Sequence, residues 1–193
     1  VTTSAENWSM EELSSVAIDD EKAGETIVDY LIEHGHTKIA EIGANLELSQ
    51  TAILRHNGYL NSFKKHGITP DERYYERARF SYDSAYHAMK KLLEKNIEIT
   101  AVYAISDVMA IGAIRAILDK GLRVPEDISI TGFDGSTLAE YYNPKIVSIR
   151  QPHKDMAARS VELLFNMIDL HKGSCHEIIS FELTEGESVA RID

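Results

Sequence analysis

Residues 100–134, TAVYAISDVMAIGAIRAILDKGLRVPEDISITGFD, carry the pattern that decides the fold. The runs 100–106 and 128–134 are short and almost continuously apolar, as buried strands are. The segment between them predicts a helix that begins at Ser106 or Asp107 as its N-cap and stops at Gly121. Apolar strands joined by a helix are typical of a parallel sheet that helices cover on both faces.

The same alternation continues on both sides of this stretch. Further strands are expected at 14–19, 37–43, 74–80, 146–151 and 176–183, with 74–80 as an edge strand because its alternation is less clean. Further helices are expected at 21–35, 51–66, 84–95 and 153–171. We therefore predict an α/β fold with a doubly wound parallel sheet.

Composition narrows the class of protein. The chain has 193 residues with 44% hydrophobic residues, enough for one domain or one and a fraction with a real core. It has 20 basic and 31 acidic residues, which gives a net charge of −11. Contacts to nucleic-acid phosphates need an excess of basic residues, so the chain itself is not expected to bind nucleic acid. The single cysteine, Cys175, excludes an internal disulfide framework and suits a reducing compartment.

The sequence shows neither a membrane span nor a signal peptide. No apolar run approaches the roughly 18 residues of a span. The first ten residues, VTTSAENWSM, hold no basic cluster and no apolar core. We therefore expect a cytoplasmic protein without membrane contact, although a mature secreted chain could have lost its signal. Since there is no initiator Met, we also expect a piece of a longer protein.

Candidate ligand contacts follow from the positions of the strand ends. In open parallel sheets, ligands bind beyond the carboxyl ends of the strands. This rule selects the loop 44–51 with Arg55, Phe80, Ser106 with Asp107, Asp134 with Gly135, and Gln151. One aromatic ring, one guanidinium, carboxylates, a hydroxyl and an amide suit a neutral polyhydroxylated ligand, because charged groups bind hydroxyl pairs and a ring covers an apolar sugar face.

Each of these residues also has a purely structural interpretation. Ser106 or Asp107 could be only a helix cap, and Asp134 could serve a turn. Phe80 could belong to the core, and Arg55 could lie on the surface. These alternatives remain open at the level of sequence.

Signatures of enzymes and metal sites are missing. No G-x-G-x-x-G follows a strand, and neither a P-loop nor a G-x-S-x-G nucleophile elbow occurs. His34 and His36 flank Gly35 but lack a third ligand at useful spacing. We therefore expect no enzyme activity, no cofactor and no metal.

The helix at 108–118 is unusual because Arg115 is its only polar residue. Met109, Ala113 and Ala116 form a stripe of mostly small residues that would let another helix approach closely. The stripe could be buried deeper in the same domain or could form a subunit interface, and we favour the interface.

Six segments together carry a family resemblance: GHTKIAEIG (35–43), RHNGY (55–59), SDVMAIGAIRAI (106–117), GLRVPEDISITGFD (121–134), PKIVSIRQP (144–152) and ESVAR (187–191). Over nearly all of 16–191 the sequence resembles the effector-binding core of the lactose-repressor (LacI/GalR) family. The resemblance implies a bacterial transcriptional regulator with a helix-turn-helix headpiece and a two-lobed core of the periplasmic-binding-protein type (type I). A small effector between the lobes would change operator affinity.

The resemblance also implies which residues contact the effector: Arg55, Phe80 as the stacking aromatic, Ser106, Asp134, Thr51, Ser49 and, on the hinge side, Gln151. Ser106 departs from the more usual Asn, which shortens that contact. Arg55 together with Asp134 favours a sugar as the effector. These are nearly the residues that the strand-end rule selects.

In this family the cores form dimers, so the resemblance implies an isologous homodimer. Its contacts would lie near Phe80, on the helix with the small-residue stripe, and in the segment after GFD. The interface residues expected here are Met109, Ala113, Ala116, Leu138, Tyr141 and Tyr142.

The resemblance divides the chain unequally between the two lobes. Residues 22–149 and 183–193 would form the C-terminal lobe, and 1–21 and 150–182 would be segments of the N-terminal lobe. The headpiece, through which alone the protein would contact operator DNA, and most of the N-terminal lobe are expected before Val1.

Two further expectations follow from this division. The stripe Ala157, Val161, Leu164 and Ile168 should be exposed or covered by another copy of the chain. Half of a cleft cannot enclose a ligand, so this chain should bind effector weakly or not at all. The alternatives to a regulator are a periplasmic or lipid-anchored sugar-binding protein, which would need an upstream signal peptide, and a nucleotide-using enzyme, which would need a phosphate loop.

Overall fold

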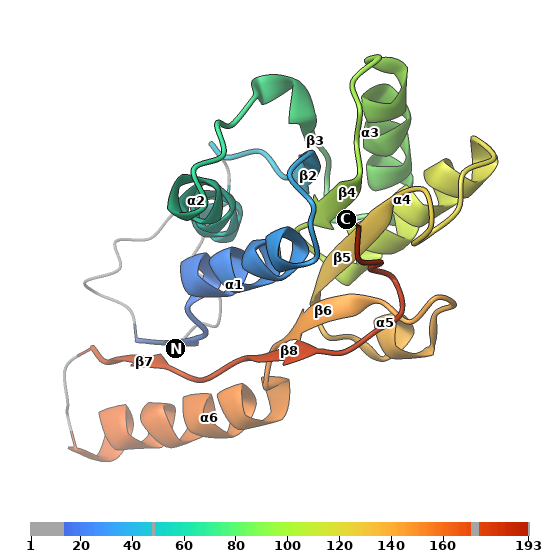
Figure 1. The fold of residues 1–193 in the computed structure, drawn as a ribbon. Coiled ribbons are helices and arrows are strands. Elements are labelled where there is room, and N and C mark those ends of the chain that lie inside the picture. The colour runs from blue at the N-terminus through green and yellow to red at the C-terminus, as the bar shows by residue number, and fades with distance from the viewer. Residues whose placement is uncertain (1–13, 48, 171–173, 193) are drawn as a thin grey trace.

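The computed structural model describes residues 14–47, 49–170 and 174–192 (Figure 1). Its strands are β1 (Ser15–Ala17), β2 (Ile39–Gly43), β3 (Tyr75–Arg77), β4 (Ala101–Ala104), β5 (Ser129–Asp134), β6 (Val147–Arg150), β7 (His176–Ile178) and β8 (Glu182–Thr184). Its helices are α1 (Asp20–Glu33), α2 (Gln50–Lys65), α3 (Tyr82–Glu94), α4 (Asp107–Asp119), α5 (Thr137–Tyr141) and α6 (His153–Leu170), with a 3₁₀ turn η1 (Glu72–Tyr74).

Six strands form the main sheet in the order β3-β2-β4-β5-β6-β8. The strands from β3 to β6 run parallel, which confirms the predicted α/β class, and β3 lies at the edge as expected. The last strand, β8, runs antiparallel to β6. The expected single strand 176–183 is therefore wrong, because β7 pairs with β1 in a separate two-stranded sheet before the chain reaches β8.

Two pairs of helices cover opposite faces of the main sheet, α1 with α2 and α3 with α4 (Figure 1). Both pairs pack closely because glycine stands at their contacts. A Cβ atom at Gly58 of α2 would lie 2.3 Å from the carbonyl oxygen of Glu21 in α1. One at Gly112 of α4 would lie 2.2 Å from the carbonyl oxygen of Tyr82 in α3. A side chain at either position would force the helices apart.

Packing between α3 and α4 overturns part of the predicted interface. Met109, Ala113 and Ala116 are buried inside the chain, since α4 packs on β4, β5 and α3. The prediction that this stripe faces a second subunit is wrong. The small side chains serve the close approach of a helix of the same chain instead. The exposed part of α4 carries Arg115 and Leu118.

The segment after GFD contains the short helix α5, which the sequence reading did not foresee. Leu138 and Tyr141 on it are 56% and 83% exposed. Tyr142 is half-buried and packs against the core. Of the six predicted interface residues, Leu138 and Tyr141 thus present large apolar surfaces to solvent, whereas Tyr142 presents less.

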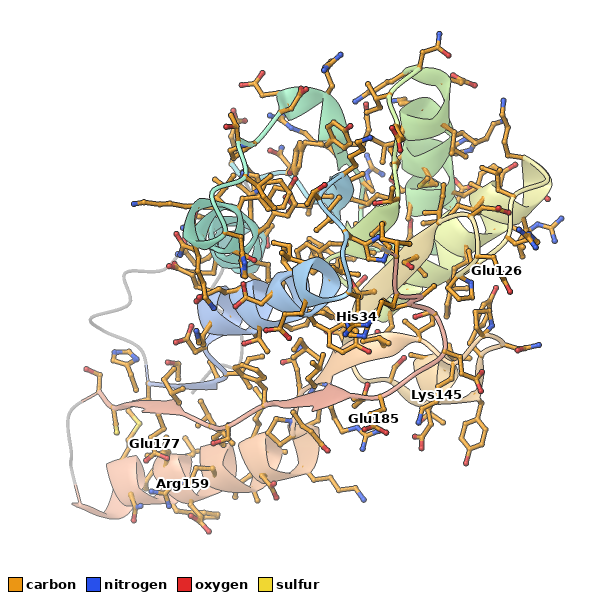
Figure 2. All side chains as sticks on the ribbon, in the orientation of Figure 1. His34, Glu126, Lys145, Arg159, Glu177 and Glu185 are labelled. Carbon is orange, nitrogen blue, oxygen red and sulfur yellow. The ribbon has the colours of Figure 1, made fainter. Side chains whose placement is uncertain are left out.

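Helix α6 packs on β1, beside the small sheet and away from the other helices (Figure 1). Arg159 donates from Nε to Oε2 of Glu177 at 2.5 Å and so joins α6 to β7; the two side chains face each other in Figure 2. Met156 and Leu163 are buried beneath the helix. Several of its other apolar residues are exposed, among them Ala157, Val161, Leu164, Phe165 and Ile168.

This exposure confirms that the chain itself leaves the α6 stripe uncovered, as expected. Residues 1–13, assigned above to the N-terminal lobe, and His171, the expected end of the helix, lie outside the described residues. In the part of the chain that the structure describes, no helix is both long enough and apolar enough to cross a membrane.

Candidate functional site

A cavity of about 480 Å³ lies at the carboxyl ends of the main-sheet strands, next to the start of α6. This volume is within the usual range for small-molecule sites. Its lining residues are Asp20, Ser49, Thr51, Arg55, Phe80, Asp134, Gln151, His153, Met156 and Ala157. Six of the seven predicted effector contacts therefore lie around one cavity.

Arg55, in the second turn of α2, is the most constrained of these residues. Its Nε donates to Oδ1 of Asp20 at 2.7 Å, and its Nη1 donates to the carbonyl oxygen of Ile105 at 2.6 Å. Nη1 also lies 3.7 Å from Oδ1 of Asp134. Its guanidinium carbon sits 3.5 Å from the centroid of the Phe133 ring. The side chain is 5% exposed, so the alternative of a surface arginine is wrong.

Asp134 ends β5 and faces the same cavity. Its φ of 110° is rare for a residue other than glycine, and strained backbone of this kind is common at binding sites. Nε2 of Gln151 donates to its Oδ1 at 2.8 Å, which ties the end of β6 to the end of β5. The pKa of Asp134 is raised to about 6, chiefly because the carboxyl is buried; the Arg55 charge opposes this shift, and the Asp107 charge supports it.

Three other predicted contacts supply the apolar and hydroxyl parts of the cavity. Phe80, just before α3, is 47% exposed and lines the cavity, so the core interpretation of this residue is wrong. Ser49 is the N-cap of α2, where its hydroxyl accepts from the amide of Ala52 at 3.3 Å. Thr51 lies in the first turn of the same helix and is half-buried.

Ser106 differs from the other predicted contacts. Its hydroxyl accepts from the amide of Met109 at 3.3 Å as the N-cap of α4, and the residue is 3% exposed. It is not among the residues that line the cavity. The structural interpretation, a helix cap, describes its position.

Asp107, the other cap candidate, holds the turn that positions Asp134. It is fully buried, and its Oδ1 and Oδ2 accept from the Ser148 hydroxyl and the Ser136 amide, both at 2.6 Å. Burial raises the pKa of Asp107, while these hydrogen bonds oppose that effect. The residue thus connects α4 to the segment that follows β5 and to β6.

Sequence reasoning missed four lining residues. Asp20 directly follows the strand predicted at 14–19, so the strand-end rule could have found it. His153 begins α6 two residues after Gln151, and Met156 and Ala157 lie one turn further along. No sequence signal marks these α6 residues as ligand contacts, because only the packing of α6 brings them to the cavity.

Taken together, the cavity has the chemistry of a site for a neutral polar ligand. Asp20 neutralises Arg55, while Asp134 and Gln151 remain beside the open volume as acceptor and donor. Phe80 adds an exposed ring that an apolar face of a ligand can cover. Among residues 14–47, 49–170 and 174–192, no three His, Cys, Asp or Glu side chains lie close enough to hold a metal ion.

Comparison with known proteins places this chain in a family. The family described as a periplasmic binding protein-like domain matches residues 28–189. The chain is 41% identical over 179 residues to the HTH-type transcriptional regulator MalR of Clostridium butyricum. That alignment covers 93% of this chain and 53% of MalR, so the chain spans about half the length of the curated relatives it matches.

Solved structures agree with this result. The structure of the transcriptional regulator CelR with cellobiose superposes with a TM-score of 0.87 at 33% identity, covering 92% of this chain and 54% of that one. A LacI-family regulator from Enterococcus faecium with bound ribose gives 0.86 at 26% identity, covering 93% and 67%. The chain belongs to the periplasmic-binding-protein-like family, within which it is an effector-binding core of the LacI type.

Proposed function

We propose that this chain forms the effector-binding and dimerisation core of a cytoplasmic bacterial transcriptional regulator whose effector is a small uncharged sugar. The observation that carries the proposal is the arrangement of Arg55, which is held rigidly by Asp20 and Ile105 beside Asp134 at an open cavity. Such prearranged polar groups bind ligand hydroxyls without first having to be ordered.

A sugar suits the cavity better than a phosphorylated metabolite. Arg55 is already paired with Asp20, and Asp134 adds a second carboxylate, so the charges around the cavity do not favour an anion. Carboxylate, guanidinium and amide groups form hydrogen bonds with vicinal hydroxyls, and Phe80 covers the apolar face of a sugar ring. Two structural relatives, the CelR–cellobiose complex and the ribose-bound regulator, support this choice.

The mechanism we infer is a shift between two arrangements of the lobes. Arg55 and Asp134 lie on the side of the cavity formed by the main sheet and its helices. This side belongs to the proposed C-terminal lobe, which consists of residues 22–149 and 183–193. His153 and Met156 belong to α6, in the segment 150–182 proposed as part of the N-terminal lobe. A ligand that contacts both sides favours one arrangement, and a headpiece outside this chain would transmit it to operator DNA.

The proposed homodimer would use a surface that differs from the predicted stripe. Leu118, at the end of α4, is 46% exposed, and Tyr82, at the start of α3, is 43% exposed. Together with Leu138 and Tyr141 they form exposed apolar surface on neighbouring helices of one lobe. Exposed apolar surface of this kind is a common feature of subunit contacts.

The test is a calorimetric titration of the longest protein encoded in this reading frame with glucose, maltose, cellobiose and ribose, and with glucose 6-phosphate. At least one neutral sugar should bind, and Arg55→Lys should weaken that binding by about tenfold or more, because lysine cannot reproduce the bonds to both partners. Arg123→Lys is the matched control, since Arg123 is exposed and pairs with Asp127 away from the cavity. Binding of glucose 6-phosphate in preference to every neutral sugar would contradict the proposal.

A further inference from the structure

A second cavity of about 580 Å³ lies between α2, the loop after β2 and the segment that leads into β3. Its lining residues are Leu46, His56, Tyr59, Leu60, Pro70, Asp71, Glu72, Tyr75 and Arg77. None of them lines the cavity around Arg55. The two cavities therefore share no lining residue.

A buried carboxylate stands behind this cavity. Glu41 occupies the middle of β2 between Ala40 and Ile42, and it is 1% exposed. Its Oε2 lies 2.6 Å from Nδ1 of His56, and its Oε1 has no hydrogen-bond partner within the described part of the chain. Replacing such a buried pair with apolar residues is often neutral or stabilising, so the pair itself adds little to the stability of the fold.

The effect of Glu41 is to fix the His56 ring. His56 lines the cavity, and with Nδ1 held by the carboxylate, Nε2 is the ring nitrogen that remains for a ligand. Nε2 has no hydrogen-bond partner among the described residues. The bond to Glu41 raises the pKa of His56, although burial opposes the shift, and burial also raises the pKa of Glu41. In the protonated ring Nε2–H is a hydrogen-bond donor.

The walls around this donor are aromatic and apolar. The His56 ring lies parallel to Tyr59, with centroids 6.1 Å apart, and meets the edge of Tyr75 at 5.2 Å. Both tyrosine hydroxyls are already used, by the carbonyl oxygens of Ile39 and Ala44. The tyrosines therefore offer ring surface to the cavity rather than polar atoms.

Three charged residues, Asp71, Glu72 and Arg77, also line the second cavity. The Arg77 guanidinium is exposed and forms no ion pair with any described residue. Asp71 is bound by Arg73, whose Nε and Nη2 lie 2.9 and 2.6 Å from its Oδ2. Glu72 and Arg77 are both exposed to solvent, where their charges are screened. The free directed donors are thus His56 Nε2 and Arg77.

We propose that this second cavity binds a small aromatic carboxylic acid, with its ring against Tyr59 and Tyr75 and its carboxylate on His56 Nε2 and Arg77. The ring walls select a flat apolar body, and the two cationic donors select an acceptor that carries negative charge. This ligand would differ in charge from the neutral sugar of the first cavity, and its binding does not depend on that proposal.

The test uses benzoate, benzamide and benzylamine, which share a ring and differ in charge. Each is titrated into the ¹⁵N-labelled protein and followed by amide chemical shifts. Benzoate should bind in about the millimolar range and shift the amides of Leu46, His56 and Tyr75. Benzamide should bind more weakly, and benzylamine should not shift these amides. Equal binding of all three, or no binding of benzoate, would overturn the proposal.

Two variants locate the site. Arg77→Gln, at an exposed position, should weaken benzoate binding by about fivefold and leave the fold intact. Arg79→Gln is the matched control, because Arg79 is exposed two residues further on and does not line the second cavity. Asp134→Asn should leave benzoate binding unchanged. Shifts centred on Phe80 and Gln151, or loss of binding in Asp134→Asn, would place benzoate in the first cavity and contradict the proposal.

Discussion

Arg55 Nε donates to Asp20 Oδ1 at 2.7 Å and thereby joins the second turn of α2 to the first residue of α1. The two helices already cross at close range where Gly58 meets the backbone of Glu21. The ion pair places the guanidinium at the edge of the main sheet, where Asp134 also ends β5. A single side chain therefore links helix packing to the geometry of the candidate site.

Arg55→Ala should lower the free energy of unfolding by about 3 kcal/mol, because it leaves Asp20 and the carbonyl of Ile105 without their donor in a buried position. Urea denaturation measures the change. The exposed Arg123→Ala, whose ion pair with Asp127 lies in solvent, should cost less than about 1 kcal/mol. Equal losses in the two variants would show that Arg55 contributes no more than a surface arginine.

Asp134→Asn should alter the pH dependence of stability. The pKa of Asp134 is raised from 3.8 to about 6 in the folded chain, so the folded state binds more protons than the unfolded state between these values. Stability contributed by this group is therefore present at low pH and is lost as pH rises toward 6.

Relative to the native chain, Asp134→Asn should accordingly gain stability between pH 4 and pH 7, by about 1 kcal/mol once the partial exposure of the carboxylate is allowed for. Thermal denaturation at a series of pH values measures the difference between the two proteins. A difference that stays constant over this range would contradict the raised pKa.

His56→Leu should lower the free energy of unfolding by about 3 kcal/mol, since it removes the hydrogen-bond partner of the buried Glu41 carboxylate. The double variant Glu41→Leu/His56→Leu should recover most of that loss, because no buried charge remains. A double-mutant cycle by urea denaturation tests both statements. If the double variant is as unstable as His56→Leu, the loss comes from packing rather than from the unpaired charge.

The two faces of α6 should respond differently to substitution. Leu163→Ala should cost about 2 kcal/mol, because Leu163 is 6% exposed beneath the helix. Phe165→Ser should change the free energy of unfolding by less than about 0.5 kcal/mol, because Phe165 is 59% exposed. Chemical denaturation of the 193-residue chain measures both. A large loss in Phe165→Ser would mean that another surface covers this face.

Leu118→Arg and Tyr141→Arg should weaken self-association without lowering the melting temperature of the monomer by more than a few degrees, since both residues are exposed within the chain. Sedimentation equilibrium measures association. Ala113→Arg should unfold the protein instead, because Ala113 is fully buried where α4 packs within the chain. Unchanged association in both surface variants would contradict the proposed dimer face.

The α/β class, the parallel direction of the central strands and most residues of the candidate site followed from the sequence alone. Apolar runs of strand length alternate with helices, and this alternation leads to few arrangements other than a helix-covered parallel sheet. Parallel strands end at one edge of the sheet, so Arg55, Phe80, Asp134 and Gln151 were predictable as neighbours although they are far apart in the chain.

Tertiary structure decided what covers each apolar face and which distant groups reach the site. Periodicity shows that Met109, Ala113 and Ala116 share a face, but it does not show whether a helix of the same chain or a second subunit packs there. Only the packing of α6 brought His153 and Met156 to the cavity. Likewise, only strand pairing placed the β7 and β8 segments in two different sheets, because pairing partners are chosen across the fold and not by local pattern.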